Sequence, residues 1–220
     1  MMNKMDERIV CVRANSVNNA CKEGILNDTV FKLHNEELEH IMKHAVIMRR
    51  GDVEDNPCFK QIIPYGILIK EVRDSASTIH YNYLSYRRTK SGGDGRLHGV
   101  YSIGFGGHMR EGEKIADCLV RELNEELLYD GEPGFAEFIC LSDHMFVPFS
   151  DEVYVINDNS SSVNSVHFGV IFPVSIDIDK ISPNEDTISE LECIPYIQLT
   201  GNLRRRYESW SQLVIDMHIR

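Results

Sequence analysis

The sequence lacks any apolar run long enough to span a bilayer. No stretch approaches the ~18 apolar residues that a membrane-spanning helix needs, and the opening MMNKMDERIVCVRANS has no uninterrupted apolar segment of the signal-peptide kind. Basic residues are few, with 23 lysines and arginines against 34 aspartates and glutamates and a formal net charge of −11. Because such a surface repels nucleic-acid backbones, we expect a soluble, cytoplasmic protein that binds neither a nucleic-acid polymer nor a membrane.

Cysteine pairs with metal-ligand or disulfide spacing are also missing. The six cysteines stand at positions 11, 21, 58, 118, 140 and 193, and none forms a CxxC pair. We therefore expect buried free thiols rather than a zinc site or a disulfide framework. The single tryptophan, Trp210, lies in an amphipathic C-terminal stretch. We expect it in the core or in an interface rather than as a stacking platform for bases.

The pattern of apolar residues predicts one large domain with a mixed set of elements. Of the 220 residues, 42% are hydrophobic, which is enough for a core. Apolar spacing predicts helices over 35–50, 113–129 and 204–219, and strands over 61–72, 79–89, 100–107, 134–147 and 166–176. Because helices and strands do not alternate strictly, we expect an α/β or α+β class rather than a doubly wound parallel sheet. Residues 1–27 are polar and are treated as a separate N-terminal segment before a domain over 28–220.

One stretch concentrates acidic residues, GGHMREGEKIADCLVRELNEELLYDGE from Gly106 to Glu132. At about 100° per residue, Glu122, Glu125 and Glu126 share one face of the predicted helix, beside an apolar stripe. Three carboxylates on one helical turn repel each other, and a divalent cation would reverse the sign of that term. A solvated acidic face is the alternative interpretation.

This stretch resembles the Nudix box, the signature of hydrolases that act on nucleoside diphosphates linked to another moiety. The family pattern is G-x5-E-x7-R-E-U-x-E-E-x-G-U, where U is a bulky apolar residue. Gly107, Glu113 and the run from Arg121 to Glu126 match it, so six of the seven fixed residues are present. The second glycine is replaced by Leu128. Because that glycine normally ends the helix in a left-handed cap, we expect the helix to continue towards Asp130.

The resemblance extends beyond the box. The segments KQIIPYGILI, YLSYRRTKSGGDGRLHGVYSIGFGGH and VHFGVIFPV resemble a subgroup of Nudix proteins known only as predicted phosphoesterases. The resemblance implies a Nudix-like mixed β-sheet sandwiched between helices, with an extra N-terminal segment.

The resemblance also implies roles for individual residues. It predicts a Mg²⁺ or Mn²⁺ ion held by the carboxylates of Glu122, Glu125 and Glu126 and by the carbonyl of Gly106. Arg121 would orient a box glutamate, and Glu113 would reach the metal directly or through water, or else act only near the positive helix end. The general base stays open, and its candidates are Glu125, Glu152 and Asp158 on the 150–165 loop.

Candidate substrate contacts flank the box. The candidates to hold phosphates border a glycine-rich loop and are Arg87, Arg88, Lys90 and Arg96, with a solvated basic loop as the alternative. His108 is a further candidate, although a structural role is favoured. His167 is expected to be packed in the core. His40 and His44 have helical spacing but lack the glutamate of a zinc-protease motif, so we expect surface histidines.

These features predict a Mg²⁺-dependent Nudix-type hydrolase. Its substrate would be a nucleoside diphosphate derivative or a similar phosphorylated metabolite, cleaved at a pyrophosphate link, and its assembly a possible homodimer. Two alternatives remain, a non-catalytic nucleotide-ligand sensor on the same fold and an isomerase of prenyl diphosphates. The intact glutamates disfavour the sensor, and the absence of a matching cysteine motif disfavours the isomerase.

Overall fold

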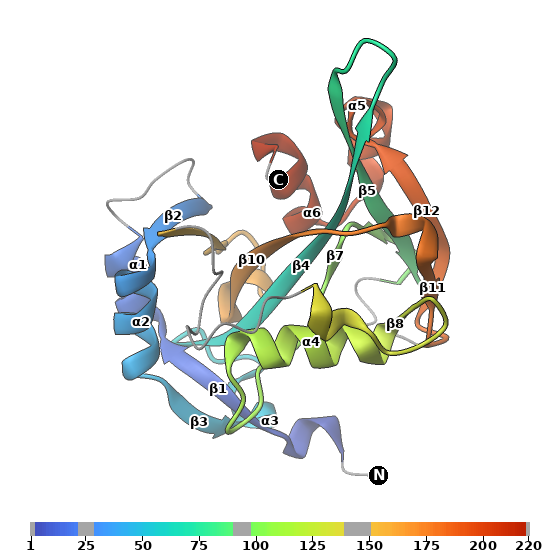
Figure 1. Cartoon of the computed structure of the whole chain (residues 1–220). Helices are drawn as coiled ribbons and strands as arrows, with labels where there is room; N and C mark the ends of the chain where they lie inside the picture. The colour runs from blue at the N-terminus through green and yellow to red at the C-terminus, as the bar shows by residue number, and fades with distance from the viewer. Residues whose placement is uncertain (1–2, 22–28, 90–97, 139–150, 219–220) are drawn as a thin grey trace. The chain divides into compact units, whose positions relative to one another are not determined.

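The computed structural model describes residues 3–21, 29–89, 98–138 and 151–218 (Figure 1). Two compact units can be distinguished. The first comprises residues 1–65, 106–119 and 141–172, and the second comprises 66–105, 120–140 and 173–220. Three elements, β4, β10 and helix α4, have residues in both ranges.

The first unit combines antiparallel strands with short helices. Its strands are β1 (Arg8–Arg13), β2 (Val30–His34), β3 (Val46–Arg49), the start of β4 (Phe59–Arg73), β9 (Glu152–Ile156) and the start of β10 (His167–Ser175). Its helices are η1 (Lys4–Asp6), α1 (Ala14–Ala20), α2 (Asn35–Lys43), α3 (Arg50–Val53) and η4 (Asn164–Val166). Strand β1 pairs with β3 and with β4, while β9 lies between β10 and β2.

The helix predicted over 35–50 is right to Lys43 and wrong beyond it. Helix α2 starts in a capping box, in which the His34 backbone N–H donates to Glu37 at 2.7 Å. From Val46 the chain is extended, and Val46 and Ile47 pair with β1. β-branched side chains suit a pleated strand, and here their partner is a strand of the N-terminal segment that the sequence left unassigned.

The second unit is built on neighbouring antiparallel strands in the order β12-β5-β4 (Figure 1). Its strands are the rest of β4, β5 (Ile79–Arg88), β6 (Tyr101–Ser102), β7 (Gly104–Phe105), β8 (Leu127–Tyr129), the end of β10, β11 (Ile181–Pro183) and β12 (Ile188–Pro195). Its helices are η3 (Phe135–Glu137), η5 (Ile178–Lys180), α5 (Tyr196–Gln198), η6 (Leu199–Leu203), η7 (Arg204–Arg206) and α6 (Ser209–Met217), together with the end of α4 (Ile115–Glu126). Strand β8 forms a separate pair with β11.

Most of the predicted elements are present. Both units combine helices with sheets, which confirms the predicted α/β (α+β) class. Strands β4, β5 and β10 confirm the strands predicted over 61–72, 79–89 and 166–176. The last helix starts only at Ser209, because the Glu208 carboxylate accepts from two backbone N–H groups and caps it there. Of the strand predicted over 134–147, residues 135–137 form a 3-10 turn, and 139–147 lie outside the described residues.

Helix α4 ends at Glu126, so the prediction that it continues to 129 and towards Asp130 is wrong. The chain becomes extended at Leu127, which is fully buried, and Leu128 pairs with Ser182 of β11. Residue 128 is therefore a strand position. It needs no left-handed backbone, which explains why a leucine can stand where the Nudix pattern has glycine.

Restoring the pattern glycine should consequently weaken this protein. We expect Leu128→Gly to lower the free energy of unfolding by about 1–2 kcal/mol, since glycine loses more backbone entropy in a strand and removes a half-buried apolar side chain. Urea denaturation measures this effect, and Leu128→Ala separates the side-chain loss from the backbone effect. A stabilised Leu128→Gly variant would contradict the strand assignment.

No helix in the described part of the chain is both long enough and apolar enough to cross a bilayer.

Candidate functional site

The acidic face of α4 carries an arginine between its carboxylates. The Arg121 guanidinium donates to Glu122 at 2.5 Å and to Glu125 at 3.3 Å. The Glu122 side chain is 15% exposed and that of Glu125 is 42% exposed, so Glu125 is the more accessible to solvent. The apolar side of the helix buries Leu123 completely. These are the contacts that an orienting role for Arg121 requires, and that role stays a prediction.

Glu126 differs from the other two glutamates because one of its carboxylate oxygens is buried, although the residue as a whole is half-buried. Its Oε2 atom is inaccessible to solvent and has no hydrogen-bond partner. The pKa of Glu126 is raised to about 8, mainly by burial and also by the neighbouring carboxylates of Glu122 and Glu185, while the positive charge of Arg88 opposes the rise. An isolated buried carboxylate is costly unless a positive group compensates it.

The two consecutive arginines of β5 have different surroundings. Successive side chains of a strand point to opposite faces. The Arg88 guanidinium lies 5.5 Å from the ring centroid of Tyr86 and acts electrostatically on Glu126. Arg87 instead donates to Glu190 at 2.8 Å and to the Gly99 carbonyl at 3.2 Å. The structure thus brings only Arg88 of this pair to the acidic helix. Lys90 and Arg96 lie outside the described residues.

A turn after β11 reaches the same helix, and this contact was not predicted from the sequence. The Asn184 backbone N–H donates to the Glu126 carbonyl at 2.8 Å, and its side-chain amide donates to the Asn124 carbonyl at 2.9 Å. The next residue, Glu185, is exposed and adds negative charge near Glu126. Only the pairing of β8 with β11, whose paired residues are 52 to 56 positions apart in sequence, brings this turn to α4, so no local pattern indicates the contact.

The end of α4 fits a hard divalent cation. Among the described residues, no three side chains of the His, Cys, Asp and Glu types converge as ligands around a common point. The buried and unpartnered oxygen of Glu126, with Glu122 and Glu125 on the same turn, nevertheless offers the oxygen donors that Mg²⁺ prefers. A cation there would stabilise the ionised form of Glu126, which burial disfavours.

Gly106, the predicted carbonyl ligand, belongs to the first unit and is sterically required. A Cβ atom at this position would lie 2.0 Å from the Pro64 carbonyl oxygen, and the backbone φ is +156°. The close approach is thus to β4 of the same unit, and the role of the Gly106 carbonyl as a metal ligand stays a prediction.

Glu113 and His108, also in the first unit, have local partners. Glu113 accepts from the Arg110 backbone N–H at 2.8 Å, which fixes the turn ahead of α4. His167 is largely buried, which lowers its pKa, and its Nδ1 lies 2.7 Å from the Val163 carbonyl. Since a carbonyl only accepts, this Nδ1 carries the proton, and Nε2 of the neutral ring accepts from Nε2 of His108 at 3.2 Å. The catalytic role of Glu113 and the substrate contact of His108 stay predictions.

Two of the candidate general bases have structural partners in the first unit. Glu152 lies within β9 rather than on a loop, and it forms an ion pair with Lys32. Asp158 is 2% exposed and accepts from the Ser160 backbone N–H at 2.8 Å and from the Asn164 side chain at 2.5 Å. Glu152 is thus paired with strand β2, and Asp158 holds the chain between β9 and β10, which favours Glu125 among the three candidates.

A buried lysine next to this segment gives the protein a pH-dependent stability. Lys60 is 1% exposed, and its Nζ donates to Asn159 at 3.0 Å and to the Ser165 carbonyl at 3.1 Å. Burial lowers the pKa of Lys60 from 10.5 to about 8. Between these values the unfolded chain binds more protons than the folded chain, so the lysine's contribution to stability rises with pH.

We therefore expect the stability difference between wild type and Lys60→Met to change with pH. The wild type should gain relative to the variant from about pH 8 upwards, by at most about 1.4 kcal/mol per pH unit. Urea denaturation of both proteins at pH 7, 8, 9 and 10 measures this. A difference that stays constant over this range would show that Lys60 keeps its ordinary pKa.

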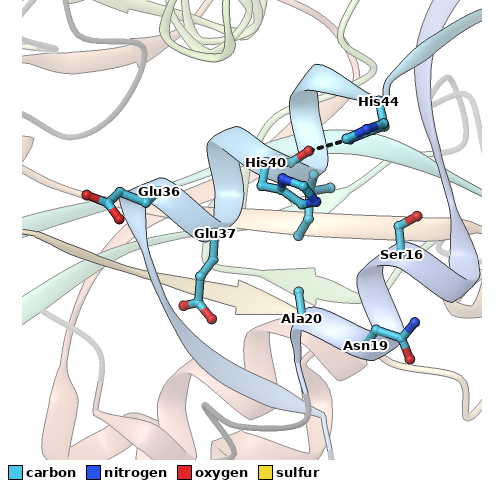
Figure 2. A pocket seen from close by; sticks show the side chains of 8 residues that line it. Ser16, Asn19, Ala20, Glu36, Glu37, His40 and His44 are labelled. Atoms are coloured by element: carbon cyan, nitrogen blue, oxygen red, sulfur yellow. Dashed lines mark hydrogen bonds between the residues drawn. The ribbon is translucent and has the colours of Figure 1, made fainter.

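A pocket of about 490 Å³ lies between α1 and α2 in the first unit (Figure 2). Its lining residues are Ser16, Asn19, Ala20, Glu36, Glu37, His40, Ile41 and His44. The His44 Nδ1 atom lies 2.9 Å from the His40 carbonyl, so it carries the proton and leaves Nε2 with a lone pair. Both histidines are exposed, as predicted. Such a pair can bind transition metals weakly, which any metal-binding experiment on this protein must control.

The remaining predictions concern packing. Trp210 is 7% exposed within α6, which agrees with a place in the core. None of the five cysteines in the described ranges forms a disulfide. Cys11, Cys21 and Cys118 are buried as expected, whereas Cys193 is half-buried and Cys58 is exposed, so the expectation of a buried thiol is wrong for Cys58. Burial raises the pKa of Cys11 and of Cys21 to about 12, so both stay protonated thiols.

Comparisons with known proteins agree with the resemblance of this stretch to the Nudix box. The NUDIX domain family matches residues 82–215. Protein YmaB of Bacillus subtilis (strain 168) is 30% identical over 235 residues, which cover 98% of this chain and 99% of that protein. The crystal structure of Tm1382, assigned to the Nudix hydrolases, is similar with a TM-score of 0.66 at 20% identity, covering 96% of this chain and 98% of that chain. The NUDIX domain of Shewanella oneidensis NrtR, solved with ADP-ribose, covers 72% of this chain and 86% of that chain at 13% identity and a TM-score of 0.47.

Proposed function

Because the chain belongs to the NUDIX domain family, we propose that it is a Mg²⁺- or Mn²⁺-dependent hydrolase. The proposed reaction is attack of water on a pyrophosphate link in a nucleoside diphosphate derivative or a similar phosphorylated metabolite. The observation that carries this proposal is the buried, unpartnered Oε2 of Glu126 beside two further carboxylates on α4. If the helix were only structural, a neutral glutamine at this position would avoid the desolvation cost of the carboxylate.

In this proposal Glu122, Glu125 and Glu126 hold the cation, and the Nudix pattern adds the Gly106 carbonyl and Glu113. When bound, the cation would neutralise phosphate charge and acidify a water molecule. Arg121 orients the carboxylates of Glu122 and Glu125, which it already contacts.

Arg88 is the proposed phosphate contact in the second unit. Its guanidinium acts on Glu126, and a planar guanidinium can donate two parallel hydrogen bonds to one phosphate group. Arg87 is held by Glu190 and the Gly99 carbonyl, so its proposed role becomes secondary to that of Arg88. Glu125 remains the preferred general base, because it is the most exposed member of the ion pairs around Arg121.

A phosphatase-coupled phosphate-release assay tests the reaction. The substrate panel would comprise nucleotide sugars, dinucleoside polyphosphates, ADP-ribose and nucleoside triphosphates, each with Mg²⁺, Mn²⁺ or EDTA. We expect turnover of at least one class that EDTA abolishes. Folded protein that turns over none of them would contradict hydrolysis, and calorimetric binding without product would identify a ligand sensor instead. Light scattering of the same sample tests the proposed homodimer.

A further inference from the structure

We propose that Asn184 is a positioning residue for the metal-binding end of α4. This inference rests on the proposed function, since it assumes that Glu125 and Glu126 hold a cation. Its basis is the pair of hydrogen bonds from Asn184 to the helix, one from the backbone to Glu126 and one from the side chain to Asn124. No sequence pattern assigned this residue a role.

The last turn of a helix needs such a partner. The final carbonyl groups of an α-helix find no N–H donor within the helix and must accept hydrogen bonds from elsewhere. The Nudix pattern supplies a glycine for this purpose, and this chain has Leu128 in strand β8 instead. The two Asn184 bonds, at 2.8 and 2.9 Å, satisfy the carbonyls of Glu126 and Asn124 and so substitute for the glycine cap.

Asn184 can fix the helix because its own turn is fixed on both sides. On one side, Pro183 pairs with Leu127 in the β8–β11 ladder. On the other side, Thr89 donates its hydroxyl to the Asp186 carbonyl at 2.7 Å and its backbone N–H to the Thr187 carbonyl at 3.0 Å. Thr89 directly follows Arg88, so one turn connects the strand end that carries Arg88 with the helix end that carries Glu126.

The positions of the Glu125 and Glu126 carboxylates therefore depend on Asn184, which is not itself a metal ligand in this proposal. Glu125 and Glu126 are the last two residues of α4, where an uncapped helix frays. A fraying turn would spread their carboxylate oxygens over several positions. Outer contacts that hold metal ligands typically matter about 10- to 100-fold in metal affinity.

The test compares Asn184→Ala with Asn202→Ala, which changes an exposed asparagine of the same unit. The Asn184 variant loses the side-chain bond and keeps the backbone bond, so the fold should persist. Mg²⁺ affinity is measured by titration calorimetry. Amide hydrogen exchange over residues 123–129 is measured separately in Mg²⁺-free buffer. We expect Asn184→Ala to weaken Mg²⁺ binding about 10-fold and to speed exchange several-fold, while Asn202→Ala matches the wild type.

The outcomes separate the two proposals. Unchanged Mg²⁺ affinity and unchanged exchange in Asn184→Ala would overturn the positioning role and leave the hydrolase proposal intact. Faster exchange with unchanged affinity would reduce Asn184 to a structural cap and also overturn the role. A wild type without any Mg²⁺ affinity would overturn the proposed metal site itself, and with it the positioning role.

Discussion

Replacing Glu126 with glutamine should lower kcat/KM by at least about 10²-fold, because a metal ligand contributes several kcal/mol to stabilisation of the transition state. The same change should make the protein more stable in Mg²⁺-free buffer. Glutamine has nearly the shape of glutamate but no charge, so it removes a carboxylate whose buried Oε2 has no partner. Lost activity with gained stability is the pattern expected of a functional site.

The measurements are steady-state kinetics on the substrate found in the panel and thermal unfolding with EDTA. Glu132→Gln is the matched control, since it removes an exposed glutamate from the segment after β8. This control should keep the kinetic constants and the melting temperature of the wild type. A Glu126→Gln enzyme with normal activity would remove Glu126 from the catalytic machinery. A less stable variant would indicate that the carboxylate has a favourable structural partner.

Replacing Gly106 with alanine should destabilise the protein by about 3 kcal/mol and lower the melting temperature by about 6–12 °C. The added Cβ would meet the Pro64 carbonyl oxygen at 2.0 Å, and a strand backbone cannot move aside as a flexible side chain does. The change therefore disturbs the first unit whether or not a metal binds.

Gly112→Ala is the control for this second prediction. Gly112 also has a positive φ, of +85°, but a Cβ there would meet no atom within 4 Å. It should cost only the backbone strain of about 1 kcal/mol. Thermal unfolding of both variants isolates the steric contribution. Equal melting temperatures for the two variants would show that the close approach at Gly106 is not present in solution.

The parts of the site that lie on one helix could be predicted from the sequence. Helical spacing alone places Glu122, Glu125 and Glu126 on one face, because the period of 3.6 residues is a local property. The same spacing placed the apolar stripe, and Leu119 and Leu123 are fully buried. The division into an N-terminal segment over 1–27 and one domain over 28–220 stays a prediction.

The remaining features depend on contacts between distant segments. The end of α4 was misplaced because strand pairing with β11 ends the helix at Glu126, and no residue near 126 indicates that pairing. Arg87 and Arg88 looked equivalent in sequence, although adjacent strand residues face opposite sides. Asn184 lies 58 positions beyond Glu126, in a turn whose polar residues would suit any loop. Contacts between distant segments, rather than local propensity, determine where α4 ends, what surrounds Arg87 and Arg88, and what Asn184 contacts.

The most direct test of the account is to locate the cation. Crystals soaked in millimolar Mn²⁺, with a diphosphate ester present, can be examined for anomalous scattering from manganese. We predict a peak bounded by the carboxylate oxygens of Glu122, Glu125 and Glu126. Crystals that show no peak there, or a peak only beside His40 and His44, would contradict the proposed metal site and the hydrolase mechanism that depends on it.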